Sequence, residues 1–249
     1  MVRQDLLVER SPEWMLPMLH LGEIVRDGGP TGFVREFGTE LFEYLDDHPE
    51  FGEVFNAHMT SLSQDDTRLV LEALDSYDFS AFSQVCDIGG GHGDLLCHLL
   101  DAHPHLEGTV LERPSVLAEE DRLWAPKMGV EDRCTYEAGD MFEAVPAADA
   151  YLMKAILHDW ADEDCIQILS TIHGAAPADG RLFIVEAVIP GPNESHFAKR
   201  LDMTMMVHAG GRERTTSEYS ALLETSGWTL VDTWVPPEGP LSVLEARPT

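Results

Sequence analysis

The feature that most constrains the fold is a regular alternation of strand-like and helix-like segments that begins near residue 84. The expected strands lie at residues 84–88, 108–111, 134–137, 150–153, 181–185, 229–235 and 241–246. The expected helices between them lie at residues 93–102, 114–128, 162–175, 198–207 and 216–226. Parallel strands need long crossover connections, usually helices, so this alternation predicts a mostly parallel sheet with helices on both faces.

The last two expected strands are too close together for a crossover helix. Only Pro236 to Pro240 separates them, so they must form an antiparallel hairpin. We therefore predict an α/β protein with a Rossmann-like, mostly parallel sheet of seven strands that ends in a C-terminal antiparallel hairpin. The predicted division is a helical segment at residues 1–82 and an α/β domain at residues 83–249.

The chain before the first strand has helical periodicity. The expected short helices lie around residue 14 and at residues 37–45, 51–62 and 63–74. Gly28-Gly29-Pro30 and His48-Pro49 are expected to interrupt the helical pattern. Ser63 followed by Asp66 resembles a capping box that opens the last of these helices.

Acidic residues dominate the charge of the chain. There are 45 Asp plus Glu against 16 Lys plus Arg, which gives a formal net charge of -29. Such a chain repels nucleic acid and anionic membranes. The acidic residues are spread along the whole chain, which favours a solvated surface adapted to high salt over an acidic patch for a basic partner. We therefore expect a halophilic source, with the basic partner as the alternative.

The sequence shows neither a membrane span nor a disulfide pattern. No apolar run approaches the roughly 20 residues that cross a bilayer, and the N-terminus lacks a signal-peptide pattern, so we expect a cytoplasmic protein. Cys86, Cys97, Cys134 and Cys165 have no C-x-x-C spacing. They are expected to be reduced thiols in the core.

A glycine-rich loop follows the first expected strand. Asp87–Gly93 reads D-I-G-G-G-H-G and precedes a helix, so it lies at the carboxyl edge where open α/β sheets bind ligands. The dinucleotide pattern G-x-G-x-x-G is not met, because Asp94 stands at its third glycine. Glu112 ends the next strand 23 residues after Gly89, which is the spacing of an acidic residue that binds the ribose of a nucleoside. Taken alone, the loop also fits a plain strand-to-helix turn.

Two further segments fall on the same edge of the expected sheet. Asp140 and Met141 follow the third strand, where they fit either contacts to an adenine ring or a turn with a core methionine. Lys154 and His158 follow the fourth strand. A histidine here is either structural or a proton-transfer group above the ligand cleft.

The order of several motifs is similar to a known family. The motifs are Asp87–Gly93, Gly139–Phe142, the run K-A-I-L-H-D-W at 154–160, the run V-E-A-V-I-P at 185–190 and the run G-G-R-E-R-T at 210–215. From about Ser11 onward the chain resembles S-adenosylmethionine-dependent O-methyltransferases of the plant caffeic-acid and bacterial polyketide type. The resemblance implies methyl transfer to a hydroxyl group of a small, aromatic or apolar molecule, without a metal ion.

The resemblance also implies roles for individual residues. The implied cofactor contacts are Gly89, Gly91, Glu112, Arg113, Asp140, Met141 and Lys154. The implied catalytic residues are His158 as general base, flanked by Glu186 and Glu213, and the implied acceptor contacts are Phe55, Met59 and His208. A neutral imidazole suits removal of a phenol proton, and the two carboxylates would stabilise the resulting imidazolium.

The front of the chain departs from the family. Members normally carry an N-terminal winged-helix dimerisation domain, and about 80 residues precede the glycine loop here, so the chain is expected to lack that domain. This leaves open whether the chain is naturally short or truncated, and whether it forms a homodimer. The alternative function is an S-adenosylmethionine-binding protein of drifted or absent activity, although a pure binder has no need of His158, Glu186 and Glu213 together.

Overall fold

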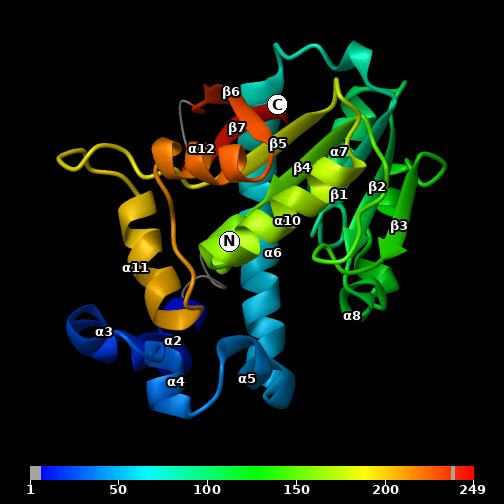
Figure 1. Cartoon of the computed structure of the whole chain (residues 1–249). Coiled ribbons are helices and arrows are strands. Elements are labelled where there is room, and N and C mark those ends of the chain that lie inside the picture. The colour runs from blue at the N-terminus through cyan, green and yellow to red at the C-terminus, as the bar shows by residue number, and fades with distance from the viewer. Residues whose placement is uncertain (1–6, 237–238) are drawn as a thin grey trace.

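The structure is a computed structural model that describes residues 7–236 and 239–249. Within them, seven strands form one sheet in the order β3-β2-β1-β4-β5-β7-β6 (Figure 1). The strands are β1 (Gln84–Ile88), β2 (Glu107–Glu112), β3 (Cys134–Ala138), β4 (Ala150–Lys154), β5 (Arg181–Glu186), β6 (Trp228–Trp234) and β7 (Ser242–Pro248). β1 to β5 are parallel, and β7 is antiparallel to both β5 and β6. The predicted Rossmann-like sheet with its C-terminal antiparallel hairpin is confirmed.

The strand order fixes where a ligand can bind. From β1 the chain moves outward to β2 and β3, and then crosses to β4 on the other side of β1. The connections therefore leave β1 and β4 in opposite directions, which opens a crevice at their carboxyl ends. The glycine loop follows β1 and the His158 turn follows β4, so both lie at this crevice.

Helices cover both faces of the sheet (Figure 1). They include α6 (Pro49–Leu74), α7 (Asp94–Ala102) and α9 (Ala125–Met128) on one face, and α10 (Asp162–Ala175) and α12 (Thr216–Thr225) on the other. Neighbouring residues of β4 point to opposite faces, so Leu152 packs with Leu96 of α7, whereas Met153 packs with Ile168 of α10. This two-sided burial explains why the central strands are almost wholly apolar.

The N-terminal helices pack beside the sheet domain rather than on it. They are α2 (Pro12–Met15), η1 (Pro17–His20), α3 (Leu21–Asp27), α4 (Gly32–Phe37), α5 (Leu41–Asp47) and the first half of α6. Phe33, Leu41 and Phe55 form their small core. α11 (Ala198–His208), which follows β5, lies against α3 and α4 (Figure 1). Two segments far apart in the sequence, α6 and α11, therefore join the N-terminal helices to the sheet.

Four of the expected helices differ from those in the structure. The expected helices at 51–62 and 63–74 are one continuous helix, α6, so Ser63 is not an N-cap. The expected helix at 37–45 is broken, because Gly38 adopts a left-handed conformation that ends α4. The expected helix at 114–128 is three short helices: α8 (Pro114–Leu117), η3 (Glu120–Arg122) and α9. There the backbone N–H of Trp124 donates to the carbonyl of His92 in the glycine loop instead of to a helical partner.

Other expectations concern the cysteines and membrane spans. All four cysteine side chains are buried thiols, which confirms their expected place in the core. In the described part of the chain, every helix is too short or too polar to cross a membrane.

Candidate active site

The glycine loop forms a tight turn between β1 and α7. Gly89, Gly91 and Gly93 all have φ angles in the left-handed region, at +64°, +57° and +87°. Glycine adopts this region without the steric cost that a Cβ brings. A Cβ on Gly91 would meet no atom within 4 Å, whereas one on Gly93 would press on Tyr136. The loop therefore faces open space at Gly91, as close approach of a ligand requires.

Glu112 ends β2 and reaches back to this loop. One carboxylate oxygen accepts a hydrogen bond from the Gly91 N–H at 3.0 Å, and the other accepts from the Arg113 N–H at 2.7 Å. The side chain is 12% exposed, while that of Arg113 is 71% exposed and extends into solvent. Each carboxylate oxygen keeps a second lone pair, so Glu112 can still accept from a ligand hydroxyl.

Asp140 and Met141 lie on the same edge after β3. A carboxylate oxygen of Asp140 accepts from the Phe142 N–H at 2.9 Å, which closes a local turn. Met141 is partly buried against the core on the α10 face. These contacts fit the turn-and-core alternative, and they also leave the second Asp140 oxygen available to a ligand.

Lys154, at the end of β4, lies among polar and acidic side chains. Its ammonium donates to the backbone carbonyl and the hydroxyl of Ser63 on α6. Burial lowers the pKa of Lys154, while nearby carboxylates, of which Asp94 acts most strongly, oppose the shift. Burial also raises the pKa of the Asp87 carboxyl to about 7, although Lys154 counters the rise. Sequence and structure thus place Lys154 next to the glycine loop.

Asp94 is a further buried acid at the start of α7. Both of its carboxylate oxygens are buried and make no hydrogen bond within the described part of the chain, and Nδ1 of His98 lies 3.4 Å from Oδ1. A buried carboxylate without hydrogen bonds is costly. A buried carboxylate beside the open glycine loop suits a cationic ligand such as an ammonium group.

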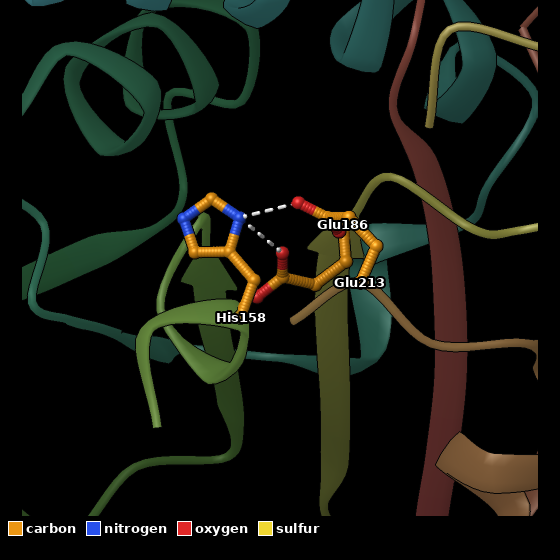
Figure 2. Close-up of side chains that lie close together, drawn as sticks. All are labelled: His158, Glu186 and Glu213. Atoms are coloured by element: carbon orange, nitrogen blue, oxygen red, sulfur yellow. Dashed lines mark hydrogen bonds and ion pairs between the residues drawn. The ribbon is translucent and has the colours of Figure 1, made fainter. Parts of the chain in front are cut away.

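His158 lies on the short helix η4 (Leu157–Asp159), and two buried glutamates lie on one side of its ring (Figure 2). Its Nδ1 is 2.9 Å from Oε1 of Glu213 and 3.5 Å from Oε2 of Glu186. Oε1 of Glu186 also accepts from the N–H groups of Ile156 and Leu157, at 3.0 and 2.7 Å. Both glutamates therefore face Nδ1, and Nε2 is left for another partner, with Asp159 Oδ1 at 3.7 Å.

These charges shift the acid–base properties of the group. Burial opposes protonation of His158, but the charges of Glu186 and Asp159 and the hydrogen bond that the imidazole donates to Glu213 outweigh it and raise the pKa of His158 to about 10. Burial raises the pKa of Glu186 to about 7, and the positive charge of His158 limits that rise. In the ligand-free protein, the imidazole therefore holds its proton at neutral pH.

The same three side chains are spaced closely enough to bridge a cation. Their ligand atoms lie within 4.8 Å of one another. However, both carboxylates already face one imidazole nitrogen, Glu213 through a charge-assisted hydrogen bond and Glu186 through an ion pair at 3.5 Å. This geometry suits a proton held on Nδ1.

The expected acceptor residues lie elsewhere, along the N-terminal helices. Phe55 is buried in the core of these helices, and Met59 on α6 is 44% exposed. His208 on α11 is buried, and its two ring nitrogens lie 3.1 and 3.0 Å from the carbonyl oxygens of Thr204 and Trp14. Its ring stacks on the Trp14 ring at 4.1 Å between centroids. His208 thus ties α11 to α2.

Sequence reasoning missed several residues that shape the site. Ser63, Asp94 and Arg214 each contact or adjoin an expected site residue. Arg214 stands beside Glu213 in the G-G-R-E-R-T run, so that motif already carried the signal for it. Asp94 directly follows the glycine loop, and Ser63 gave no signal beyond its incorrect assignment as a helix cap.

The chain matches the family model of the O-methyltransferase domain over residues 18–229. It belongs to the O-methyltransferase family. A phenazine O-methyltransferase of Lysobacter antibioticus is 41% identical over 221 residues, which covers 88% of this chain and 63% of that protein. A mitomycin biosynthesis 6-O-methyltransferase of Streptomyces lavendulae is 40% identical over 222 residues, covering 88% of this chain and 62% of that protein.

A solved structure supports this membership in three dimensions. The methyltransferase CalO1 of calicheamicin biosynthesis, in a form with S-adenosylhomocysteine bound, has a TM-score of 0.88 and 32% identity to this chain. The alignment covers 99% of this chain and 72% of CalO1. The chain spans less than two thirds of the length of the phenazine and mitomycin relatives. The family resemblance predicted from the motifs is confirmed.

Proposed function

We propose that this chain binds S-adenosylmethionine at the carboxyl ends of β1 to β4 and transfers a methyl group to a hydroxyl of a small aromatic or apolar molecule, as an enzyme of the EC 2.1.1 class. The observation that carries the proposal is His158, whose Nδ1 is held by two buried glutamates while Nε2 makes no hydrogen bond among the described residues. A non-catalytic binder would have no need of this buried charge arrangement.

The cofactor would lie along the glycine-loop edge. Gly91 would admit it to the backbone, with Gly89 as a further contact, and Glu112 would accept from its ribose. The Asp94 carboxylate, which makes no hydrogen bond among the described residues, would suit its ammonium group. The other proposed contacts are Arg113, Asp140, Met141 and Lys154. When bound, the cofactor supplies a methyl carbon that its sulfonium charge activates toward a nucleophile.

The chemical step asks two things of the protein. The acceptor oxygen must be aligned with the methyl carbon, and its proton must be removed. Nε2 of His158 would take this proton, while Glu213 and Glu186 hold the ring and stabilise the imidazolium through Nδ1. His158 must first release its own proton, and positive charge bound at the neighbouring edge favours release because it lowers the pKa of the imidazole.

The helical segment at residues 1–82 would roof the acceptor site above the cofactor domain at 83–249. The support comes from α6, because Ser63 on this helix accepts hydrogen bonds from Lys154 at the sheet edge. Met59 lies one helical turn before Ser63 and so shares its face. Phe55 and His208 would act by shaping this roof, since both are packed inside it.

Dimerisation is a separate proposal. Leu19, Val25 and Phe42 on the N-terminal helices are large apolar side chains that are 77%, 69% and 50% exposed. Large apolar side chains exposed to solvent are a feature of interfaces. We propose a homodimer through these helices, and sedimentation equilibrium in molar KCl would distinguish it from a monomer.

Turnover of methyl-labelled S-adenosylmethionine tests the proposed activity. The labelled cofactor is incubated in high salt with a panel of phenols, hydroxylated polyketides and hydroxy-isoprenoids, and label in the products is counted. Label should appear in a hydroxyl-methylated product. Calorimetric binding of the cofactor without transfer to any acceptor would instead favour a protein of drifted or absent activity.

A further inference from the structure

The loop at residues 210–215, which carries Glu213, encloses the His158 turn. Gly211 and the residues after it run beside η4, and Val188 forms a parallel bridge with Arg214 just after β5. The Ile189 N–H also donates to the Arg214 carbonyl at 2.9 Å. The loop thus lies between the two other segments that bear members of the catalytic group, those of His158 and Glu186.

Backbone and side-chain donors from this loop meet the carbonyl groups of the His158 turn. The Arg212 N–H donates to the His158 carbonyl at 2.8 Å. The guanidinium of Arg214 donates to the carbonyls of Leu157 and Trp160, each at 2.8 Å. Three of the four carbonyls in residues 157–160 are therefore bonded from a segment only three residues long.

The side chain of Arg214 uses its donors to bind the His158 turn and the start of α10. Its side chain is fully buried, and its remaining donors bind Asp162 at the start of α10, at 2.8 and 3.1 Å. A buried guanidinium is costly to desolvate unless its donors are satisfied, and the planar fork can hold several acceptors in a fixed geometry. Replacing Arg214 would therefore remove its hydrogen bonds to the turn and its ion pair with Asp162, whose side chain is 42% exposed.

Gly211 allows the loop at residues 210–215 to pack closely against the backbone of the His158 turn. A Cβ at this position would overlap the carbonyl oxygen of His158 and press on the backbone of Asp159. Its φ angle is not in the left-handed region, so glycine is needed here for close packing rather than for backbone conformation.

We propose that Gly211 and Arg214 are positioning residues that hold the His158 turn against Glu213 and Glu186, and so set the geometry of the base. This inference rests on the proposed function, in which His158 takes the acceptor proton. Neither residue touches the reacting atoms in this proposal. Their effect is on the distance between Nδ1 and the two carboxylates, which is 2.9 Å for Glu213 and 3.5 Å for Glu186.

The test uses substitutions with matched controls. Gly211→Ala adds one methyl group at the point of contact, and Gly174→Ala adds the same group in α10 where no atom lies within 4 Å. Arg214→Met removes the donors to the turn and keeps much of the side-chain bulk. Arg212→Met removes a neighbouring arginine that binds the same Asp162, while its backbone N–H to His158 is kept. Arg214→Lys keeps a positive charge at this position and tests whether that charge restores part of the function.

The first readout is the titration of His158 in the ligand-free protein, followed by NMR of labelled imidazoles and assigned by comparison with His158→Gln. If the turn loosens, Nδ1 moves away from the carboxylates, and the pKa of His158 should fall by at least about one unit in Gly211→Ala and Arg214→Met. Loss of the Arg214 charge alone would act in the opposite direction, by raising that pKa. The two controls should titrate as the wild type does.

The second readout separates binding from turnover. At a pH above the His158 pKa, where the imidazole is neutral in every variant, kcat of Gly211→Ala and Arg214→Met should fall about 10- to 100-fold, as expected of a small misplacement of a catalytic group, while the calorimetric Kd for S-adenosylmethionine changes less than about twofold. Arg214→Lys should recover part of both the kcat and the His158 pKa.

Folded Gly211→Ala and Arg214→Met proteins with a wild-type His158 titration would overturn the positioning role. If Gly211→Ala fails to fold, the comparison of Arg214→Met, Arg214→Lys and Arg212→Met decides the question by the same measure. Because the titration needs no acceptor, a wild-type protein that binds the cofactor and methylates nothing would refute the proposed function and still leave this comparison valid.

Discussion

His158 is a residue whose role depends on its neighbours. A histidine in water has a pKa near 6.5, whereas the two glutamates and Asp159 raise that of His158 to about 10 against the effect of burial. Ala155, three residues earlier, has a φ of +54°, which is rare for a residue with a Cβ. This sharp turn after β4 directs the chain into η4 and brings the imidazole to the glutamates.

Replacing His158 should separate binding from chemistry. His158→Gln keeps a polar side chain but cannot take a proton at neutral pH, so kcat should fall about 10²- to 10⁴-fold while cofactor affinity persists. The measurements are turnover of a labelled methyl group and a calorimetric titration of S-adenosylmethionine. A wild-type rate near pH 7 in this variant would show that alignment of the reactants suffices without a base.

The pH profile should report the charge state of His158. The free enzyme is reactive when the imidazole is neutral, so kcat/KM should rise about tenfold per pH unit from neutrality and level off near the pKa of about 10. An acceptor that ionises only above this range keeps its own titration out of the profile. His158→Gln should lack the rise, and a wild-type profile that is flat from pH 7 to 9 would contradict the raised pKa.

Among the elements, the glycine loop shows best how a turn creates a binding edge. It is held by the end of β2, since the Gly89 N–H donates to the Leu111 carbonyl and Glu112 accepts from the Gly91 N–H. Its position follows from the strand order, which brings the ends of β1, β2 and β4 together.

A side chain at Gly91 should block the cofactor without displacing other protein atoms. Gly91→Val would project into open space, and Gly129→Val at the end of α9 is a matched control with a similar φ of +69° and no neighbour within 4 Å. Both variants should lose roughly 1–2 kcal/mol of stability, because a Cβ is strained in the left-handed region. Only Gly91→Val should lose S-adenosylmethionine affinity by calorimetry. Equal affinity in the two variants would move the proposed site elsewhere.

The element predictions failed where a long-range contact replaced a local signal. Ser63 and Asp66 have the spacing of a capping box, but α6 runs through them and the Ser63 carbonyl and hydroxyl accept from Lys154, 91 residues away. In the segment after β2, the N–H groups of Trp124 and Ala125 donate to the glycine loop and to the hydroxyl of Tyr136. Helical periodicity cannot reveal partners that the fold alone brings near.

At the scale of the whole molecule, the net charge of -29 is the dominant property. Like charges on one surface repel each other, and the Debye length shrinks from about 10 Å at 0.1 M salt to about 3 Å at 1 M. The melting temperature should therefore rise with KCl well beyond 0.15 M. Calorimetric scans from low to molar KCl provide the check, and a flat or falling melting temperature would remove the halophilic interpretation.

The sequence by itself determined the fold class, because strand and helix periods are local patterns, and its motifs indicated the candidate site residues through their resemblance to a known family. Strand and helix periods, the glycine turn and the motifs after each strand are all readable over a few residues, and parallel strands place their carboxyl ends at one edge. Tertiary structure alone decided how these residues act on one another. Glu186 and Glu213 lie 28 and 55 residues from His158 in the sequence, yet both face its Nδ1. Burial among the packed segments then sets the pKa of that imidazole, since desolvation and charge distance are properties of the folded chain.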